Sequence, residues 1–427
     1  MRIDNVVVAV IGLGYVGLPL AVSFAKKYEV IAYDIDENRV NELIAGFDRT
    51  QEIQDPNLLS QNNLRITHDE NILRDANVYI ITVPTPIDEF KQPDLSPLIS
   101  ASQITGLNLK KGNYVIYEST VYPGATEEVC SVILSEKSGL ELNQDFYIGY
   151  SPERINPGDN THTFENIVKI TSGSTPDAAH FIDALYSSVI SAETYLAPNI
   201  KVAEAAKVIE NIQRDINIAF VNELSMLFDK LNIDTLEVLS AAATKWNFLH
   251  FKPGLVGGHC IGVDPYYLAH KAREVGFHAE MIESGRRIND QYPKFIVEKL
   301  IREIIIGKIN PINCRILLLG YTFKENCPDI RNTKVSDILK ELQALHFDVD
   351  IVDPYATDIG NILVGNIEIQ KEIPNNNYEV IIGAVAHDTF ISAADDILTN
   401  HAAEKCIVVD VKNMFSNCPD NLKHVKF

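Results

Sequence analysis

The chain has 427 residues, of which 46% are apolar, and a formal net charge of -21. Its length predicts two or three domains with ordinary buried cores. The negative charge argues against nucleic-acid and anionic-membrane partners, and no apolar run reaches the ~20 residues that span a bilayer. We expect no signal peptide, because the N-terminus has no basic segment and no small-residue cleavage site. Six scattered cysteines without a C-x-x-C pair predict a reduced, cytoplasmic chain with no metal site.

The first 200 residues alternate strand-like and helix-like runs. Strands are expected at 6–11, 29–36, 77–84, 113–120, 146–153 and 166–173, and a helix is expected at 18–28. This alternation predicts a parallel sheet with crossover helices. The strand-like runs end in polar residues, at the position where open parallel sheets bind ligands.

A glycine-rich motif follows the first strand. In GLGYVG, Gly12, Gly14 and Gly17 have the G-x-G-x-x-G spacing, and Asp34 ends the next strand. In this context the motif predicts a dinucleotide site, with the pyrophosphate at a helix N-terminus and the carboxylate on ribose hydroxyls. Asp34 would repel a 2′-phosphate and so favours NAD over NADP, although Arg39 lies nearby. The expected NAD contacts are Gly12, Gly14, Tyr15, Val16, Gly17, Asp34, Arg39, Pro84 and Thr85; the alternative is a tight turn without a ligand.

Residues 200–231 contain no Gly or Pro and predict one long helix, which bridges two domains or packs against a partner chain. Lys207 and Asn211 are four residues apart and therefore share a helix face. In isolation this pair is typical of a solvated polar stripe.

The sequence GLVGGHCIGVD at 254–264 raises three interpretations of Cys260. It is a packed thiol, a nucleophile activated by His259 as in cysteine hydrolases, or the nucleophile of a dehydrogenase that oxidises one carbon twice. In the third case a thiolate adds to an aldehyde, the thiohemiacetal gives up a hydride, and water releases the acid from a thioester. A nearby lysine would stabilise each developing oxyanion.

A second α/β region begins near residue 306 and lacks the glycine motif, so we expect it to bind a different ligand. Strands are expected around 314–320, 348–354, 378–387 and 405–413, and a helix at 334–345. Lys324, Asp329 and Arg331 follow the first of these strands and form either a charged loop or a cationic clamp for a diphosphate.

Another strand-end motif, SPERINPG, places Glu153 and Arg154 between two prolines, Pro152 and Pro157. Such a pair is often structural. The prolines predict a rigid loop, which favours contact with a substrate.

The motifs GLGYVGLPLA, TVPTP, ESTVYPG, SPERINPG, AKVIEN, GGHCIGVD and FKENCPDIRNT occur in this order. Together they resemble the nucleotide-sugar 6-dehydrogenases, the family of UDP-glucose and GDP-mannose dehydrogenases, over nearly the whole chain. The resemblance implies an α/β fold with two Rossmann-like doubly wound domains joined by a long central helix in a helical dimerisation region. The implied domains are an NAD-binding domain at 1–200, a central domain with the cysteine loop at 201–305, and a UDP-binding domain at 306–427.

The resemblance also implies a four-electron oxidation of a sugar C6 alcohol with two NAD. Cys260 would be the nucleophile, Lys207 and Asn211 would hold the C6 oxygen, Asp264 would position or activate water, and Glu153 would assist thioester hydrolysis. Thr120 would lie by the nicotinamide and the attacking water, and Arg331 on the cofactor side. The implied substrate contacts are Glu153, Arg154, Lys207, Asn211, Phe248, Leu249, Gly257 and Lys324.

Within the family, the Arg154 form of the motif and GGHCIGVDPYYL resemble the UDP-N-acetylhexosamine 6-dehydrogenases of bacterial surface-polysaccharide pathways. They are most similar to those acting on UDP-GlcNAc or UDP-GalNAc. Where many UDP-glucose enzymes carry an arginine donated across the dimer, this chain has Thr244 and Lys245. The alternatives are a UDP-glucose or UDP-ManNAc 6-dehydrogenase, a two-electron hydroxyacid or 6-phosphogluconate-type dehydrogenase, and a non-catalytic NAD- or UDP-sensing module.

Overall fold

The structure, a computed structural model, describes residues 5–155, 163–356, 363–364 and 366–427. Contacts divide the chain into two compact units, which are described one at a time. The N-terminal unit comprises residues 1–210 and 266–278, and the C-terminal unit comprises residues 211–265 and 279–427.

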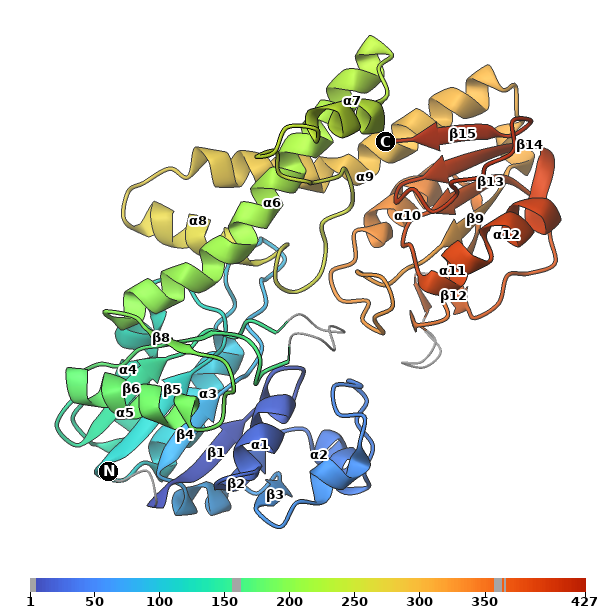
Figure 1. The fold of residues 1–427 in the computed structure, drawn as a ribbon. Coiled ribbons are helices and arrows are strands. Elements are labelled where there is room, and N and C mark those ends of the chain that lie inside the picture. Colours follow the sequence, from blue (N-terminus) through green and yellow to red (C-terminus); the bar gives the residue numbers. More distant parts are fainter. Residues whose placement is uncertain (1–4, 156–162, 357–362, 365) are drawn as a thin grey trace. The chain divides into compact units, whose positions relative to one another are not determined.

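A six-stranded parallel sheet with strand order β3-β2-β1-β4-β5-β6 forms the centre of the N-terminal unit (Figure 1). Its strands are β1 (Val7–Ile11), β2 (Glu29–Tyr33), β3 (Leu64–Thr67), β4 (Val78–Ile81), β5 (Asn113–Tyr117) and β6 (Phe146–Tyr150). They are rich in Val, Ile and Tyr because both faces of the sheet are covered. The helices are α1 (Gly17–Ala25), α2 (Glu37–Ile44), α3 (Ser96–Asn108), α4 (Ser131–Ser138) and α5 (Pro176–Ser187), with short helical turns at Pro56–Ser60, Glu70–Asp75 and Thr126–Cys130.

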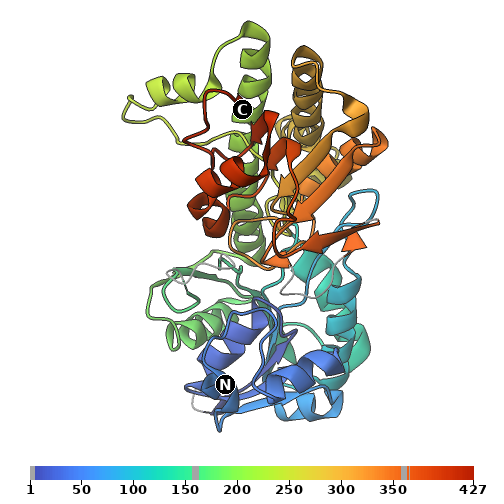
Figure 2. The ribbon, with the colours of Figure 1, turned by 90° about the vertical axis from the view of Figure 1, so that its right-hand side faces the viewer.

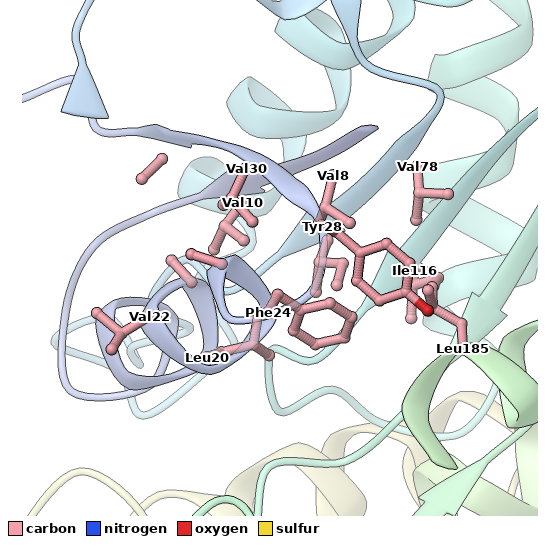
Figure 3. Close-up of a cluster of buried hydrophobic side chains, with 14 of the residues drawn as sticks. Val8, Val10, Leu20, Val22, Phe24, Tyr28, Val30, Val78, Ile116 and Leu185 are labelled. Carbon is pink, nitrogen blue, oxygen red and sulfur yellow. The ribbon is translucent and has the colours of Figure 1, made fainter. Parts of the chain in front are cut away.

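The core of this unit lies between the sheet and helices α1 and α5 (Figure 3). Val8, Val10 and Val78 point from the sheet toward Phe24 on α1, and all four side chains are buried. The ring of Phe24 meets the ring of Tyr186 on α5 edge to face, with centroids 5.6 Å apart. This packing fixes α1, and with it the turn that enters α1 from β1.

The run at 166–173, expected in the same parallel sheet, lies elsewhere. Its central residues form β7 (Lys169–Thr171), which pairs with β8 (Thr194–Leu196) in a separate two-stranded sheet. Gly173 makes a single antiparallel bridge to Gly149 of β6, and a Cβ on Gly149 would lie 2.5 Å from the carbonyl oxygen of Ser172. The two segments therefore meet by backbone approach at glycines rather than as paired strands.

The long helix is confirmed. Helix α6 (Ile200–Leu231) spans 32 residues, as the run without Gly or Pro predicts, and it continues from one unit into the other. The further helices are α7 (Thr235–Ala242), α8 (Asp264–Glu274) and α9 (Glu280–Ile306). Among the described helices, none combines the length and the apolar character that a membrane crossing needs.

A seven-stranded sheet with strand order β11-β12-β10-β9-β13-β14-β15 forms the C-terminal unit, shown from a second side in Figure 2. Its strands are β9 (Arg315–Leu319), β10 (Asp348–Val352), β11 (Leu363–Val364), β12 (Ile367–Gln370), β13 (Tyr378–Gly383), β14 (Ala402–Asp410) and β15 (Lys423–Lys426). They pair in parallel except β11 with β12. The associated helices are α10 (Val335–Ala344), α11 (Asp388–Ser392) and α12 (Ala394–His401), with a short turn at Pro311–Asn313. The predicted α/β fold with two Rossmann-like units and a long helix is thus confirmed.

Candidate active site

The three glycines in the turn between β1 and α1 have different geometric surroundings. Gly12 has a φ of +97°, which disfavours other residues. A Cβ on Gly17 would lie 1.8 Å from the carbonyl oxygen of Gly12, so only glycine lets α1 start so close to the strand. Around Gly14 no atom lies within 4 Å of a Cβ position, and the residue is exposed. The open side of the turn therefore lies at Gly14, at the start of α1, where a pyrophosphate fits.

Asp34 follows β2 and supports this turn directly. Its carboxylate accepts hydrogen bonds from the backbone N–H of Leu13 at 2.7 Å and of Asp36 at 2.9 Å. It remains partly exposed. Each carboxylate oxygen has further acceptor capacity, which suits it to ribose hydroxyls.

Arg39 lies beneath the turn rather than at its open side. Its side chain is buried, donates from Nε to the carbonyl oxygen of Leu13 at 2.9 Å and pairs with Asp48 at 2.7 Å. Asp48 also accepts from the backbone N–H of Glu52 and Ile53. In this arrangement Arg39 anchors the glycine turn to the 48–53 loop, and its guanidinium is not presented to a 2′-phosphate.

The ends of β4 and β5 are tied together beside this turn. The hydroxyl of Ser119 donates to the carbonyl oxygen of Val83 at 2.6 Å. Thr85 and Thr120 follow these strands and are partly exposed, and Pro84 is exposed. Tyr15 and Val16, in the glycine turn, are partly exposed as well.

Glu153 and Arg154 follow β6 and point to different partners. The Glu153 side chain is buried and one oxygen accepts from the backbone N–H of Ile155. Arg154 pairs with Glu210 of α6 at 2.9 Å and donates to the carbonyl oxygen of Val168 at 2.8 Å. Of the two prolines that predict a rigid loop, Pro152 is buried, and Pro157 lies outside the described residues.

A buried ion pair next to Glu153 was missed by sequence reasoning. Lys169, the first residue of β7, lies 2.6 Å from the carboxylate of Glu118, which directly follows β5. Both side chains are buried. One feature of the sequence indicated this ion pair: a lysine inside the apolar run IVKIT is expected to be buried and therefore needs an oppositely charged partner.

Helix α6 carries the buried Lys207. One turn earlier it carries Glu204, whose carboxylate is also buried. Glu204 accepts from the backbone N–H of Gly124 at 2.5 Å and of Thr126 at 2.9 Å. Burial raises the pKa of Glu204 to about 7, although these hydrogen bonds act in the opposite direction. The helix is thereby attached to the loop that follows Thr120.

In the C-terminal unit, the Cys260 loop lies against the 323–334 segment. A Cβ on Gly257 would lie 2.6 Å from the carbonyl oxygen of Asn332, and a Cβ on Gly258 would lie 2.7 Å from the Phe323 ring. Both glycines are thus required by close approach, as their pairing predicted. Cys260 itself is partly exposed.

His259 faces the charged loop of the same unit. Its Nδ1 lies 3.6 Å from Asp329, and its ring meets Phe323 edge to face with centroids 5.7 Å apart. Arg331 pairs with Asp329 at 2.5 Å. Lys324 is partly exposed, and its carbonyl oxygen accepts from the hydroxyl of Thr322 at 3.0 Å.

Asn211 and Asp264, two of the expected site residues, are in direct contact. The Asn211 amide donates to the Asp264 carboxylate at 2.6 Å, and both side chains are buried. Asp264 also begins α8, and its backbone N–H donates to the carbonyl oxygen of Cys260 at 2.9 Å. One hydrogen-bonded chain therefore links Asn211, Asp264 and Cys260.

A further contact fixes the loop that precedes Cys260. Asn222, buried on α6, accepts from the N–H of Gly254 at 2.8 Å and donates to its carbonyl oxygen at 3.0 Å. Phe248, Leu249, Thr244 and Lys245 lie before this clamp; Phe248 is partly exposed and the other three are exposed.

A small pocket within the C-terminal unit is lined by the cysteine loop and by segments that follow its strands. Its lining includes Leu255, Gly257, Phe323, Lys334 and Lys412. Both lysines pair with carboxylates, Lys334 with Asp290 and Asp337 and Lys412 with Glu325. Among the described residues no cluster of His, Cys, Asp and Glu could hold a metal ion.

The turn after β9 in the C-terminal sheet resembles the turn after β1 in the N-terminal sheet, except that the aspartate that supports it is buried rather than partly exposed. Gly320 has a φ of +87°. Asp353, after β10, accepts from the N–H of Tyr321 at 2.6 Å and of Thr322 at 2.9 Å. His387 Nδ1 accepts from the N–H of Asn326, so Nε2 carries the proton that faces Asp353 at 3.1 Å. Asp353 is fully buried.

Comparison with known proteins gives three family matches in chain order. The UDP-glucose/GDP-mannose dehydrogenase NAD-binding domain matches residues 6–190, the central domain 201–291 and the UDP-binding domain 317–417.

Two relatives are similar over nearly their whole length. The UDP-N-acetyl-D-glucosamine 6-dehydrogenase of Salmonella typhi is 52% identical, covering 96% of both chains. That of Pseudomonas aeruginosa is 50% identical, covering 97% of this chain and 99% of its own. Among solved structures, the UDP-D-ManNAc dehydrogenase from Pyrococcus horikoshii has a TM-score of 0.89 at 30% identity, covering 98% of both chains.

Proposed function

Because the chain belongs to the UDP-glucose/GDP-mannose dehydrogenase family, whose members are NAD-dependent nucleotide-sugar dehydrogenases, we propose that it oxidises C6 of a UDP-N-acetylhexosamine, UDP-GlcNAc or UDP-GalNAc, to the uronic acid. The observation that carries the proposal is the identity of 52% and 50% to relatives named for UDP-N-acetyl-D-glucosamine. Three relatives named for UDP-N-acetyl-D-mannosamine are 32%, 35% and 30% identical. We place the product in surface-polysaccharide biosynthesis and the enzyme in the cytoplasm.

In the proposed chemistry, NAD accepts one hydride in each of two oxidations. The thiolate of Cys260 adds to the aldehyde carbon and forms a thiohemiacetal, and loss of the second hydride leaves a thioester. Water then breaks the carbon–sulfur bond and restores the thiolate. One alcohol, one water and two NAD⁺ thus give one carboxylate, two NADH and three protons.

The remaining roles are proposed for residues of both units. Lys207 and Asn211 hold the C6 oxygen and stabilise its developing charge. The bond from Asn211 to Asp264 orients both side chains, which supports Asp264 as the group that positions water. Glu153 assists thioester hydrolysis, and Thr120 lies by the nicotinamide.

Substrate selection is assigned to the strand-end loops. Arg154 is fixed by Glu210 and the Val168 carbonyl, and we assign to it and its loop the space for the 2-acetamido group. Gly257, Lys324, Phe248 and Leu249 contact the UDP-sugar, whose nucleotide binds the 306–427 domain. Arg331 acts on the cofactor side.

The proposed assembly is a homodimer or a higher oligomer formed through residues 201–305. Phe220, Leu227 and Leu231 are exposed large apolar residues on α6. Their spacing of seven and four places them on one helix face, and a partner chain would cover them.

A panel of UDP-sugars scored by NADH formation tests the substrate. We expect high kcat/KM for UDP-GlcNAc or UDP-GalNAc and a value up to ~10⁴-fold lower for UDP-glucose, as when a site built for a polar group meets a substrate without it. A kcat/KM for UDP-glucose that equals the acetamido sugars would contradict the substrate assignment while leaving the family in place. One NADH per sugar instead of two would indicate a two-electron dehydrogenase.

A further inference from the structure

A buried charge cluster lies at the carboxyl edge of the N-terminal sheet, directly behind Glu153. The Lys169 ammonium is 2.6 Å from Glu118 and 3.7 Å from the second oxygen of Glu153. The hydroxyl of Tyr186 donates to the other oxygen of Glu118. Lys169 is the one cation that faces both carboxylates among the residues described here.

The surroundings of Lys169 fix its position. Its side chain is 3% exposed and that of Glu118 0%, and the ammonium lies 5.3 Å from the Phe164 ring centre and 5.6 Å from that of Tyr186. Both rings attract a cation through their faces. The ammonium is therefore held between two rings and two carboxylates and cannot leave for solvent.

Glu153 has one oxygen engaged and one available. The first accepts from the Ile155 N–H. The second accepts no hydrogen bond from any described residue, although it is buried. This oxygen faces the ammonium of Lys169 at 3.7 Å, so the orientation of the carboxylate depends on the cation.

We propose that Lys169, held by Glu118 and Tyr186, is a positioning residue that fixes the orientation of Glu153 for thioester hydrolysis. The inference rests on the proposed role of Glu153. Without the ammonium, no cation among the described residues would lie between the carboxylates of Glu118 and Glu153, and their repulsion would turn Glu153 away from its position.

The groups that face the cluster are Glu118 after β5, Glu153 after β6, Lys169 on β7 and Tyr186 on α5. Burial raises the pKa of Glu118 to about 7, whereas Lys169 lowers it and Glu153 raises it. Lys169 therefore opposes the effect of burial on Glu118, and replacing Glu118 with Gln should weaken the hold on the ammonium.

The test uses the variant pair E118Q/K169M in the full chain, because K169M alone would leave a buried charge unpaired. We expect kcat to fall ~10²-fold, the lower range for a lost general base, with KM for the UDP-sugar changed little. Slow hydrolysis should give a burst approaching two NADH per site before a slow steady state. The matched control is K111M, which breaks the exposed pair between Lys111 and Asp145 and should leave kcat unchanged.

Two further variants distinguish a failure of the inference about Lys169 from a failure of the proposed role of Glu153. E118Q alone tests the proposal even if the double variant does not fold. It removes the carboxylate that holds the ammonium, so kcat should fall while the KM for the UDP-sugar changes little; an unchanged kcat overturns the inference. E153Q tests the proposed function itself. If E153Q is slow while E118Q/K169M turns over like the parent, Lys169 is only structural; if E153Q turns over like the parent, the role of Glu153 is wrong.

Discussion

At the scale of single residues, the proposed chemistry depends on Cys260. It lies in a loop that two glycines hold against the 323–334 segment, and the residue is partly exposed. Burial raises the pKa of Cys130, Cys314 and Cys406 to about 12. Those three thiols are therefore inert at neutral pH.

Cys260→Ala should abolish formation of the uronic acid while NAD and UDP-sugar still bind with affinities near those of the parent. The aldehyde would have no sulfur to convert it into a second hydride donor. Cys260→Ser should form a slow, persistent ester, because a hydroxyl is a poorer nucleophile. NADH per sugar consumed is the measurement, and full four-electron turnover by the alanine variant would make the thiol a packing group.

We expect Asp34 to set the cofactor preference at the same scale. The unmodified protein should use NAD in preference to NADP, since the carboxylate repels a 2′-phosphate and Arg39 is occupied by Leu13 and Asp48. Asp34→Ala should weaken NAD binding by about 1.5–3 kcal/mol, the contribution of a hydrogen bond to a charged group. Titration of both cofactors against both proteins measures this, and equal activity with NADP in the parent would refute it.

At the scale of elements, two glycine-to-alanine substitutions in the β1–α1 turn distinguish an effect on folding from an effect on NAD binding. Gly17→Ala places a Cβ 1.8 Å from the Gly12 carbonyl oxygen, so it should destabilise the unit by about 3 kcal/mol, the upper range for overpacking. Gly14→Ala meets no protein atom within 4 Å. It should leave the unfolding free energy within about 1 kcal/mol but raise the KM for NAD at least tenfold, because the backbone can no longer approach the pyrophosphate.

Chemical denaturation and NAD kinetics on both variants check this pair. A Gly14→Ala protein with the parent's KM would mean that the pyrophosphate does not approach the turn at that residue.

The elements also show how far sequence reasoning reaches. Helix 200–231 was predicted to its ends because no Gly or Pro interrupts it, and the glycine turn was predicted because its spacing has one common structural cause. The 166–173 run was assigned to the wrong sheet, because strand character does not specify a partner. Arg39 shows the same limit, because its position in the sequence near Asp34 does not reveal that its side chain points inward to Asp48. That Glu118 is the partner of Lys169 could not be predicted either, because the two residues are 51 positions apart in the sequence.

At the scale of the whole molecule, buried carboxyls set a pH dependence of stability. Burial raises the native pKa of Glu204 to about 7 from 4.5. Between these values the native state binds more protons than the unfolded state, so this group's stabilisation is complete below about pH 4.5 and is lost as the pH rises toward 7. At 1.36 kcal/mol per pKa unit the loss is on the order of 3 kcal/mol.

Glu204→Gln should therefore unfold with a free energy that falls less between pH 5 and pH 8 than that of the parent. Its absolute stability should be lower at pH 5, because the amide nitrogen of Gln cannot accept from Gly124 or Thr126, whereas both oxygens of a neutral carboxyl can. Equal slopes for the two proteins would show that Glu204 is ionised throughout this range.

The buried Asp353 has a consequence for the order of events in a turnover. Its oxygens accept from backbone N–H groups and face the Nε2 proton of His387, so Asp353 is not available to a ribose. We therefore expect calorimetric titration to find one NAD per chain, although the proposed four-electron oxidation needs two for each sugar. On that proposal, NADH must leave and a second NAD must bind halfway through the reaction, while the half-oxidised sugar stays bound. NADH should then dissociate quickly and the UDP-sugar slowly, so retention of the intermediate would depend on the UDP rather than on the oxidised carbon.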